Sequence, residues 1–467
     1  MIREVFFQIA FIIFVLYFFV LTLYYLILNV VSFFEYFKRR KEHDEEDYTA
    51  LSVSSFTVPV SIIIPAHNEE VWIEDCVKSV LNLSYPEFEV IVVDDESTDK
   101  TLTILKSVLR LKFIHNPYTD HFSSGKIIGL YRSDQYPNVN VISKKAGSKK
   151  AGALNAGLNI AKYKFVCVMD ADTILEDNAL LKVMAHVQKD PERVIGIGSY
   201  FGLVNGFKIK DGKILERSFS QRPVVAYQNL EYIRSFIGNR IAWSKFNAMP
   251  TVAGGFGVWR RDVILELGGY DPNFSSEDIE FTFRAHGYIA KHKKKKYRIM
   301  MLPYYVGWTE GPADVRSLIQ QRNRWQRVTI ETIWRYKYML FNPKYGGFGF
   351  ITFPYVLFYE VLGVFFETAS VLVTLLGFLA GLLDIEMFMA FFTLMILCQA
   401  FISLISLSAF NCVQELFKFK NASRLVLLGL VEFFWYRWII SWSKILGTFS
   451  FLRGVRTHDQ VCRTREH

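Results

Sequence analysis

The sequence predicts an α/β domain with a mainly parallel sheet, covered by helices on both faces and flanked by membrane helices. Strand-like apolar runs at Val60–Pro65, Phe88–Asp95 and Phe165–Asp172 alternate with helical stretches, which predicts the sheet. Apolar residues also concentrate before residue 35 and after residue 348, which predicts the membrane helices. The chain of 467 residues is long enough for both parts.

The composition supports a membrane protein. Hydrophobic residues make up 51% of the chain and aromatic residues 16%, more than an ordinary soluble protein carries. The formal net charge of +9 fits loops that face anionic lipid. The alternative interpretation of a basic chain is nucleic-acid binding, but the sequence contains no nucleic-acid motif, so we expect none. None of the five cysteines forms a C-x-x-C pair, which predicts reduced thiols.

Val5–Phe34 is an apolar run of roughly 30 residues, and about 20 span a bilayer. A cleavable signal peptide has a shorter apolar core and a small-residue cleavage site, so we interpret this run as a spanning helix. Lys38–Lys41 is wholly basic, and positive charge stays on the cytosolic side. We therefore expect an integral membrane protein, of a bacterial or archaeal plasma membrane, whose α/β domain is cytosolic.

Three more apolar stretches follow the α/β domain. Phe348–Leu383 is interpreted as an interfacial helix that leads into a spanning helix, and Ile385–Phe410 as a second span. Leu425–Leu446 is apolar enough to span but carries Glu432, Arg437 and Lys444. A spanning course would place the basic C-terminal tail outside, against the positive-inside tendency, so we favour an interfacial or re-entrant course.

These observations predict four segments. Residues 1–40 form the N-terminal membrane helix and 41–57 a cytosolic linker. Residues 58–345 form the α/β domain with an interfacial helix at its end, and 346–467 form the C-terminal membrane and interfacial helices with a basic tail.

Two acidic clusters follow predicted strands, Asp94-Asp95 and Asp170-Ala-Asp172. Ligands of an open α/β sheet bind at the carboxyl ends of its strands, so both clusters are expected to face one cleft. Two nearby carboxylates suit a divalent cation that holds a diphosphate. The first pair could contact a nucleoside, although a turn rich in helix-capping residues remains an equal alternative.

Two further motifs are typical of binding sites. Small residues and lysines over Ser148–Asn155 would let the backbone and an ammonium group approach phosphates, although an ordinary helix N-terminus is the alternative. Thr251–Gly257, which includes Gly254 and Gly255, would let an acceptor approach the backbone closely.

The end of the α/β domain carries candidate catalytic groups. Ser275–Glu280 offers carboxylates that could serve as a general base for an attacking hydroxyl, or acids that only stabilise a helix N-terminus. Arg322 and Arg324 could clamp a diphosphate, and Trp325 offers a flat face on which a sugar can stack. The alternative for this last motif is an amphipathic helix on the membrane surface.

Taken together and in this order, the motifs resemble those of the membrane-integrated family 2 glycosyltransferases, which include hyaluronan, chitin-oligosaccharide, cellulose and, most closely, poly-N-acetylglucosamine synthases. The matching motifs are Pro65-Ala-His-Asn-Glu69, Asp94-Asp95, Lys150-Ala-Gly-Ala-Leu-Asn155, Asp170-Ala-Asp172, Glu277-Asp278 and Gln321-Arg-Asn-Arg324-Trp325. His67 and Glu96 depart from the family's usual residues. The Phe-x-Val-Thr-x-Lys gating loop of cellulose synthases is absent, which disfavours that member.

The resemblance implies a nucleotide-diphospho-sugar transferase fold of the GT-A type, an Mg or Mn ion, and inversion at the sugar carbon. It implies nucleotide-sugar contacts by Pro65, Asn68, Glu69, Asp94, Asp95, Lys150 and Asp170. Asp172, with Asp170, would bind the metal, and Asp278 would be the catalytic base beside Glu277. Contacts to the diphosphate and acceptor are implied for Gln321, Arg324 and Trp325, to which the glycine-rich segment adds Gly254 and Gly255.

The resemblance therefore implies an enzyme that polymerises a β-linked polysaccharide from a UDP-sugar, UDP-N-acetylglucosamine or UDP-glucose, at the cytosolic face. The alternative is a non-processive enzyme that adds a sugar to a membrane lipid such as diacylglycerol. Expected partners are the UDP-sugar donor, the growing glycan or lipid acceptor, membrane lipids and an accessory membrane or export subunit. A catalytically inactive membrane scaffold is disfavoured, because every expected acid is present.

Overall fold

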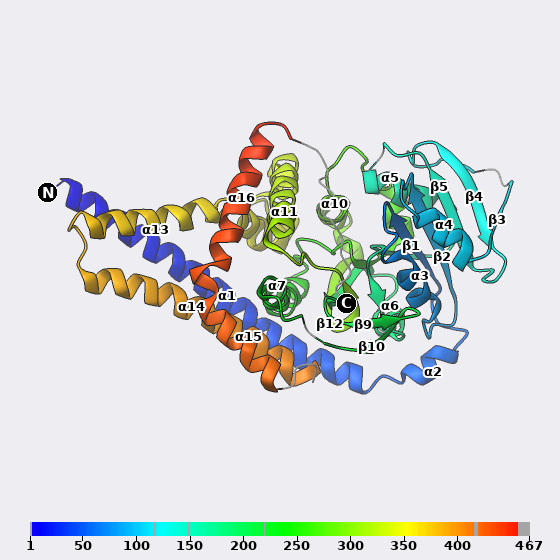
Figure 1. Cartoon of the computed structure of the whole chain (residues 1–467), viewed down its shortest axis with the longest axis horizontal. Helices are drawn as coiled ribbons and strands as arrows, with labels where there is room; N and C mark the ends of the chain where they lie inside the picture. The colour runs from blue at the N-terminus through cyan, green and yellow to red at the C-terminus, as the bar shows by residue number, and fades with distance from the viewer. Residues whose placement is uncertain (1, 116–117, 148, 219, 415–418, 456–467) are drawn as a thin grey trace. The chain divides into compact units, whose positions relative to one another are not determined.

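The computed structural model describes residues 2–455, apart from 116–117, 148, 219 and 415–418. Figure 1 labels its helices and strands, and their contacts divide the chain into two units. The sheet unit comprises residues 39–221 and 247–311, and the helical unit comprises residues up to 38, 222–246 and those from 312 on. The segment 222–246 thus packs with the terminal helices, although it lies within the predicted α/β segment 58–345, whose bounds remain a prediction.

The sheet unit is built on ten strands in the order β3-β4-β5-β2-β1-β6-β11-β8-β12-β7, which confirms the predicted α/β class. The strands are β1 (Val60–Ala66), β2 (Phe88–Asp95), β3 (Leu111–Phe113), β4 (Ile127–Ser133), β5 (Val139–Lys144), β6 (Phe165–Met169), β7 (Ile174–Leu175), β8 (Val194–Leu203), β11 (Phe256–Arg260) and β12 (Arg298–Thr309). A separate hairpin pairs β9 (Lys208–Lys210) with β10 (Lys213–Glu216).

The sheet is mixed rather than mainly parallel, which corrects one detail of the prediction. Its parallel pairs join β5 to β2, β2 to β1, β1 to β6, and β8 to β12. β4 runs antiparallel to β5 because only residues 134–138 connect them, and a parallel pair needs a longer crossover. β11 also enters antiparallel, between β6 and β8.

The parallel register brings the predicted strand ends to one edge of the sheet. Ala66 of β1 lies opposite Asp94 of β2, and Asp95 of β2 lies opposite Lys144 of β5. Met169, the last residue of β6, pairs with Phe256 at the beginning of β11. The segments that follow β1, β2 and β6, and the one that precedes β11, therefore meet at this edge.

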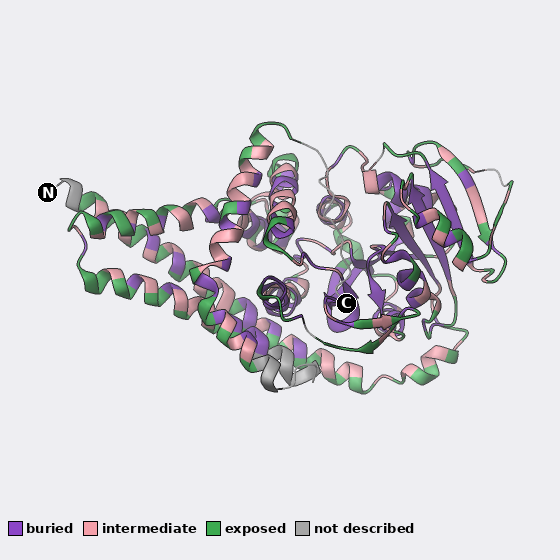
Figure 2. Cartoon of the chain, in the orientation of Figure 1, coloured by how far each residue is buried: buried purple, intermediate pink, exposed green. Residues whose placement is uncertain are grey.

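The strands of this region form because their residues are apolar and often β-branched, which suits a sheet covered on both faces. Every residue of β1 and β6 is buried, as Figure 2 shows for the centre of the sheet unit. The helices of this unit are α2 (Tyr48–Val53), α3 (Ile73–Leu81), α4 (Thr101–Val108), α5 (Lys149–Ile160), α6 (Ala179–Lys189), α9 (Arg261–Glu266), α10 (Glu277–Lys291) and the short 3₁₀ turn η2 (Lys293–Lys295). Of these, α5 packs against β1 and β2, and α6 against β8 and β12.

The helical unit contains the apolar helices. Its elements are α1 (Ile2–Asp44), α7 (Pro223–Ile233), η1 (Arg234–Arg240), α8 (Ile241–Lys245), α11 (Val315–Tyr336), η3 (Lys337–Met339), η4 (Pro343–Tyr345), η5 (Phe348–Thr352), α12 (Phe353–Tyr355), η6 (Val356–Val361), α13 (Gly363–Leu379), α14 (Ile385–Gln414), α15 (Phe419–Val431), η7 (Glu432–Phe434) and α16 (Tyr436–Leu452). The last residues of α1, from Arg39 on, belong to the sheet unit.

Two helices are long and apolar enough to cross a membrane, Val5–Asp44 and Ile385–Leu407, as the sequence predicted. Large apolar side chains of α1 are exposed, including those of Phe6, Ile9, Ile12, Leu16 and Phe19, which is expected of a helix that faces lipid (Figure 2). Two further apolar stretches are bent helix pairs. The pair 348–379 bends by 45° and the pair 423–452 by 54°, so up to four spans are compatible with the described residues.

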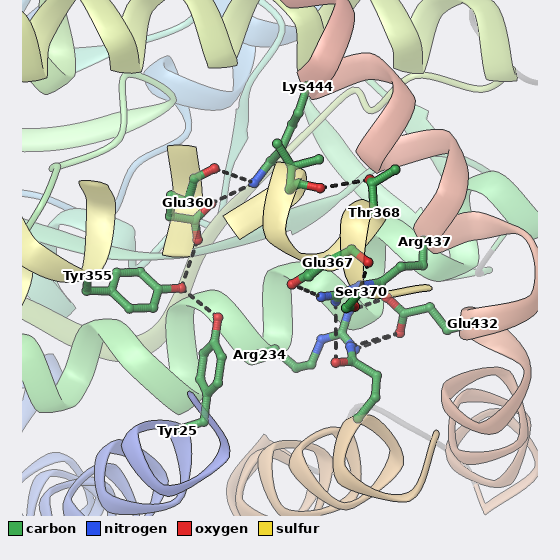
Figure 3. A network of polar contacts seen from close by, with 12 residues as sticks. Tyr25, Arg234, Tyr355, Glu360, Glu367, Thr368, Ser370, Glu432, Arg437 and Lys444 are labelled. Carbon is green, nitrogen blue, oxygen red and sulfur yellow. Dashed lines mark hydrogen bonds and ion pairs between the residues drawn. The ribbon is translucent and has the colours of Figure 1, made fainter. Parts of the chain in front are cut away.

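Charged residues of the bent pairs contact one another (Figure 3). Glu360 of η6 forms an ion pair of 2.8 Å with Lys444 of α16, and Glu367 of α13 forms one of 2.5 Å with Arg437 of α16. Arg234 of η1 makes two hydrogen bonds with Glu432, of 2.6 and 2.8 Å. The three charges that made Leu425–Leu446 ambiguous are thus each paired with an opposite charge.

Candidate active site

The candidate site lies at the sheet edge where the strand ends meet. Asp94 and Asp95 end β2, and Asp170 directly follows β6. Both carboxylates of the first pair are buried, and burial raises the pKa of Asp94 above its ordinary value. Hydrogen bonds to Asp94 from the Ser97 backbone (3.3 Å) and the Ser143 hydroxyl (3.3 Å) act in the opposite direction, by stabilising the charged form.

Lys144 holds Asp95. Its ammonium group is fully buried, forms an ion pair with Asp95 and donates a 2.9 Å hydrogen bond to the carbonyl of Lys145. A buried lysine needs such a partner, because an isolated ammonium in an apolar interior is very costly. Sequence reasoning missed Lys144, although its place at the end of β5, in register with Asp95, is the signal that could have indicated it.

The segment after β1 is fixed to the segment after β2. Asn68 adopts a left-handed backbone conformation with a φ of 57°, and its side chain accepts a 2.8 Å hydrogen bond from the Thr98 backbone. The Glu69 backbone donates to the Thr101 hydroxyl at 2.8 Å, and the Glu69 side chain is buried. Pro65 is buried within β1, opposite Val93 of β2. Asn68 thus links the segment after β1 to the segment after β2, and Pro65 belongs to the buried strand before it.

Lys150 lies between two carboxylates. Its Nζ atom is 2.5 Å from Asp170 and 2.6 Å from Glu277, at the beginning of α10. Burial alone would lower the pKa of Lys150, but the charges of Asp170 and Glu277 raise it above its ordinary value. Burial raises the pKa of Glu277, against the effect of Lys150. Lys150 therefore forms an ion pair with each of the two carboxylates.

Hydrogen bonds hold the Asp278 carboxylate mainly through one of its two oxygens. Its Oδ1 atom accepts hydrogen bonds from the Ser276 hydroxyl at 2.6 Å and from the Ile279 backbone at 2.7 Å. Its Oδ2 atom accepts only a longer one, 3.2 Å, from the Gly254 backbone. A carboxylate oxygen has two lone pairs, so Oδ2 keeps the capacity to accept a proton from a hydroxyl group.

The glycine-rich segment lies against this cluster. A side chain at Gly254 would place its Cβ atom 2.9 Å from Lys150 Nζ and 3.1 Å from Glu277 Oε1. A Cβ at Gly255 would be 3.1 Å from the Phe201 ring. A side chain at residue 254 would therefore displace the lysine and glutamate side chains from their present positions.

Asp172 lies two residues beyond Asp170 and is buried. The Thr309 hydroxyl at the end of β12 donates to its Oδ1 atom at 3.1 Å, a contact that sequence reasoning missed. Burial raises the pKa of the Cys76 thiol well above its ordinary value, and so do the charges of Asp172, Glu69 and Asp170. The Cys76 thiol itself contacts the backbone carbonyl of Asp170, at 3.8 Å.

The acids fit a divalent cation that the substrate also helps to bind. Within the described residues, no group of three or more His, Cys, Asp or Glu side chains is placed to hold a metal. Mg²⁺ is usually held by one or two carboxylates together with substrate phosphates, so Asp170 and Asp172 satisfy its requirement without a third protein ligand. Their oxygens are the donors that Mg²⁺ and Mn²⁺ prefer.

Gln321, Arg324 and Trp325 lie on α11, which belongs to the helical unit. Arg322 is buried there and forms a 2.6 Å ion pair with Glu231 of α7. Its guanidinium group also lies 4.1 Å from the centre of the Trp325 ring, which is 40% exposed. Glu231 and Trp325 therefore hold Arg322 within the helical unit, and its contact with a diphosphate stays a prediction.

Comparisons with known proteins match this chain to glycosyltransferases. Residues 61–134 match the family described as Glycosyl transferase family 2, and residues 130–328 match Glycosyltransferase like family 2. A probable glycosyltransferase of Bacillus subtilis, YdaM, is 29% identical over 72% of each chain. A poly-beta-1,6-N-acetyl-D-glucosamine synthase of Staphylococcus epidermidis is 23% identical over 84% of this chain and 82% of that protein.

Solved structures are more distant. A mannosyltransferase of Pyrobaculum calidifontis, in complex with GDP-Man and Mn²⁺, covers 92% of this chain and 99% of its own at 16% identity, with a TM-score of 0.47. A glucosyl-3-phosphoglycerate synthase of Mycobacterium tuberculosis, with Mn²⁺ and UDP-glucose, covers 62% of this chain and 83% of its own at 16% identity, with a TM-score of 0.37.

Proposed function

The chain belongs to the family 2 glycosyltransferases, and on that premise we propose that it is a membrane-bound, inverting enzyme that polymerises a β-linked polysaccharide from a UDP-sugar. The observation that carries the proposal is the cluster of Lys150, Asp170, Glu277 and Asp278 at the end of β6, with Asp172 two residues on. The relatives named poly-beta-1,6-N-acetyl-D-glucosamine synthases favour UDP-N-acetylglucosamine as the donor over UDP-glucose.

The donor's nucleoside is assigned to the strand end that carries Asp94 and Asp95. Lys144 fixes the Asp95 carboxylate by an ion pair, and the carboxylate oxygens can accept hydrogen bonds from a base or ribose. Lys150 faces the diphosphate, where its positive charge stabilises the leaving group as negative charge develops. A divalent cation held by Asp170 and Asp172, Mg²⁺ or Mn²⁺, would supply further positive charge at the same place.

Asp278 is assigned as the general base. Oδ2 of Asp278 accepts the proton of the acceptor hydroxyl while that oxygen bonds to the sugar's anomeric carbon. The bond from this carbon to the diphosphate oxygen breaks with its electron pair, so the configuration inverts and no covalent enzyme intermediate forms. Ser276 and Ile279 fix Oδ1, and this orients Oδ2 before the reaction.

The helical unit is assigned to the membrane, with the sheet unit on the cytosolic side. α1 and α14 supply the apolar length, and the basic residues Lys38, Arg39 and Arg40 at the end of α1 favour a cytosolic position for the residues after them. Gln321, Arg324 and Trp325 of α11 are assigned to the diphosphate and the acceptor sugar. Trp325 has the exposed ring that a stacked sugar requires.

Product size tests the proposal. The purified full-length chain, with Mn²⁺ or Mg²⁺, is incubated with radiolabelled UDP-sugars, and the products are sized after lipid extraction. A long polymer, strongest with UDP-N-acetylglucosamine, is the expected result. Label that extracts as a lipid with one or two sugars would instead indicate a non-processive lipid glycosyltransferase. No transfer from any UDP-sugar would contradict both.

A further inference from the structure

The loop 268–276 connects α9 to α10 and leads directly to Asp278, so its position decides where the general base lies. It begins with Gly268 and Gly269, whose φ angles of +82° and +75° favour glycine. On the assignment of Asp278 in the proposed function, we propose that Asn155 of α5 is a positioning residue for the transfer reaction. Its carboxamide fixes this loop, and with it Asp278, relative to Lys150.

The carboxamide of Asn155 binds the Tyr270 backbone in both directions. The Tyr270 N–H donates to Oδ1 at 2.8 Å, and Nδ2 donates to the Tyr270 carbonyl at 2.9 Å. Nδ2 also donates to the carbonyl of Ser123 at 3.1 Å, so both protons of the amide are used. Asn155 is 1% exposed, so no water can replace these bonds. A rotated amide would place its donors against a donor, which fixes its orientation.

The loop approaches Asn155 as closely as a backbone can. A Cβ atom at Gly269 would lie 2.8 Å from Asn155 Oδ1 and 2.9 Å from the Phe122 ring. A side chain at this position would therefore both collide with the carboxamide and strain a left-handed backbone. The loop therefore lies directly against Asn155 at Gly269.

Two other residues of α5 contact the same segment further along. Lys149 Nζ donates to the carbonyls of Phe274 at 3.3 Å and Asn273 at 3.4 Å. Lys150 pairs with Glu277, the residue before Asp278. The helix therefore holds the segment at its beginning, middle and end. Lys150 and Asn155 are separated by about 7.5 Å along a rigid helix, so the phosphate-facing lysine and the base are positioned by one element.

Asn159 provides a matched control on the same helix, one turn further on. Its Oδ1 atom accepts from the Phe122 backbone at 3.0 Å, and its Nδ2 atom donates to the Tyr118 hydroxyl at 2.7 Å. In the described part of the chain, none of its hydrogen bonds reaches residues 268–277. Asn159 thus holds the segment 118–122, next to Ser123, without holding the loop of the base.

The test compares full-length Asn155→Ala, Asn159→Ala and wild-type protein, with kcat and donor KM measured for UDP-N-acetylglucosamine. We expect Asn155→Ala to lower kcat by about 10- to 100-fold, since a 1 Å misplacement of reacting groups costs about 10²-fold, and to change the donor KM by less than about threefold. Asn159→Ala is expected to keep kcat within about threefold of the wild type. A purely structural role would affect both variants alike.

Two further variants cover a failure of Asn155→Ala to fold. Gly269→Ala displaces the loop from the opposite side of the contact, and Lys149→Met removes only the exposed part of it. Both are expected to lower kcat at an unchanged donor KM, Lys149→Met by the smaller factor. Wild-type kcat in these variants, or in Asn155→Ala, would overturn the inference and leave the proposed function intact. Absence of transfer by the wild-type protein would overturn both.

Discussion

Each of the two units contains a cluster of charged side chains, and the two clusters pair their charges differently. In the helical unit, Glu360, Glu367 and Glu432 pair with Lys444, Arg437 and Arg234, one base for each acid (Figure 3). At the sheet edge, Lys150 is shared by Asp170 and Glu277, with Asp172, Glu69 and Asp278 in the same region.

The difference indicates what each cluster is for. A set of one-to-one ion pairs holds helices in register and needs no ligand, although it adds little net stability. Carboxylates gathered at a strand end attract a cation, so they favour a divalent ion that arrives with an anionic substrate. We therefore interpret the helical cluster as structural and keep the sheet-edge cluster as the proposed binding site.

The largest expected effect is the loss of the base. Asp278→Asn should lower kcat by about 10²- to 10⁴-fold, the usual contribution of a general base, with donor affinity unchanged. Transfer assays and donor titrations on the same preparation measure both quantities. Asp262→Asn, which removes an exposed carboxylate paired with Arg260, is the matched control and should retain normal turnover. Normal turnover in Asp278→Asn would show that the base is elsewhere.

Breaking the ion pair between Arg234 and Glu432 should lower the stability of the protein and leave its catalytic rate unchanged. Glu432→Gln leaves the buried Arg234 guanidinium without its carboxylate, and such a loss costs about 3–5 kcal/mol. The thermal midpoint in detergent should fall, and the double variant that exchanges Arg234 and Glu432 should recover part of it. Glu216→Gln, in an exposed pair with Lys208, serves as the control. Equal midpoints for Glu432→Gln and wild type would mean that the pair does not stabilise the detergent-solubilised protein.

Removing Lys150, which pairs with two carboxylates at the sheet edge, should weaken donor binding. Lys150→Met leaves Asp170 and Glu277 without their common cation, and removes a charge-assisted hydrogen bond to phosphate worth about 1.5–3 kcal/mol. We expect the donor KM to rise by about 10- to 100-fold, measured at a fixed Mn²⁺ concentration. The exposed Lys126→Met variant should match the wild type. An unchanged KM in Lys150→Met would remove Lys150 from the donor site.

The smallest effect concerns acid stability of the sheet unit. Burial lowers the pKa of His186 from 6.5 to about 3, assisted by the charge of Arg39. The unfolded chain takes up a proton below pH 6.5 that the folded chain refuses, so stability present above pH 6.5 is lost as the pH falls. The loss is about 1.4 kcal/mol per pH unit, or about 2 kcal/mol at pH 5.

His186→Phe keeps a ring beside Tyr304 and should flatten this dependence, as measured by urea unfolding between pH 7 and pH 5. The exposed His121→Gln should not. Parallel pH profiles for His186→Phe and wild type would show that other groups cause the acid sensitivity.

Strand ends were the most predictable part of the chain. Val60–Pro65, Phe88–Asp95 and Phe165–Met169 formed β1, β2 and β6 because continuous apolar runs are typical of strands buried on both faces. The antiparallel direction of β11 was not predictable. Residues 222–246 belong to the helical unit, so the chain leaves the sheet unit before β11 forms. No local sequence pattern indicates where and in which direction the chain rejoins the sheet.

Within the candidate site, the predicted acids could be read from the sequence, but their partners could not. Lys144, Thr309 and Asn155 act through pairing between segments far apart in the chain, which periodicity does not reveal. For Arg322 the sequence also missed the partner. Its motif suggested a ligand contact, and the sequence did not reveal its ion pair with Glu231, 91 residues away.

Calorimetry of donor binding tests the proposed cation site at the sheet edge most directly. UDP-N-acetylglucosamine is titrated into wild-type and Asp172→Ala protein, with Mn²⁺ or with EDTA. The wild type should bind at least about tenfold more tightly with Mn²⁺, and Asp172→Ala should bind equally weakly in both buffers. Equal affinity of the wild type with and without metal would contradict the assignment of this acidic cluster as a cation-dependent donor site.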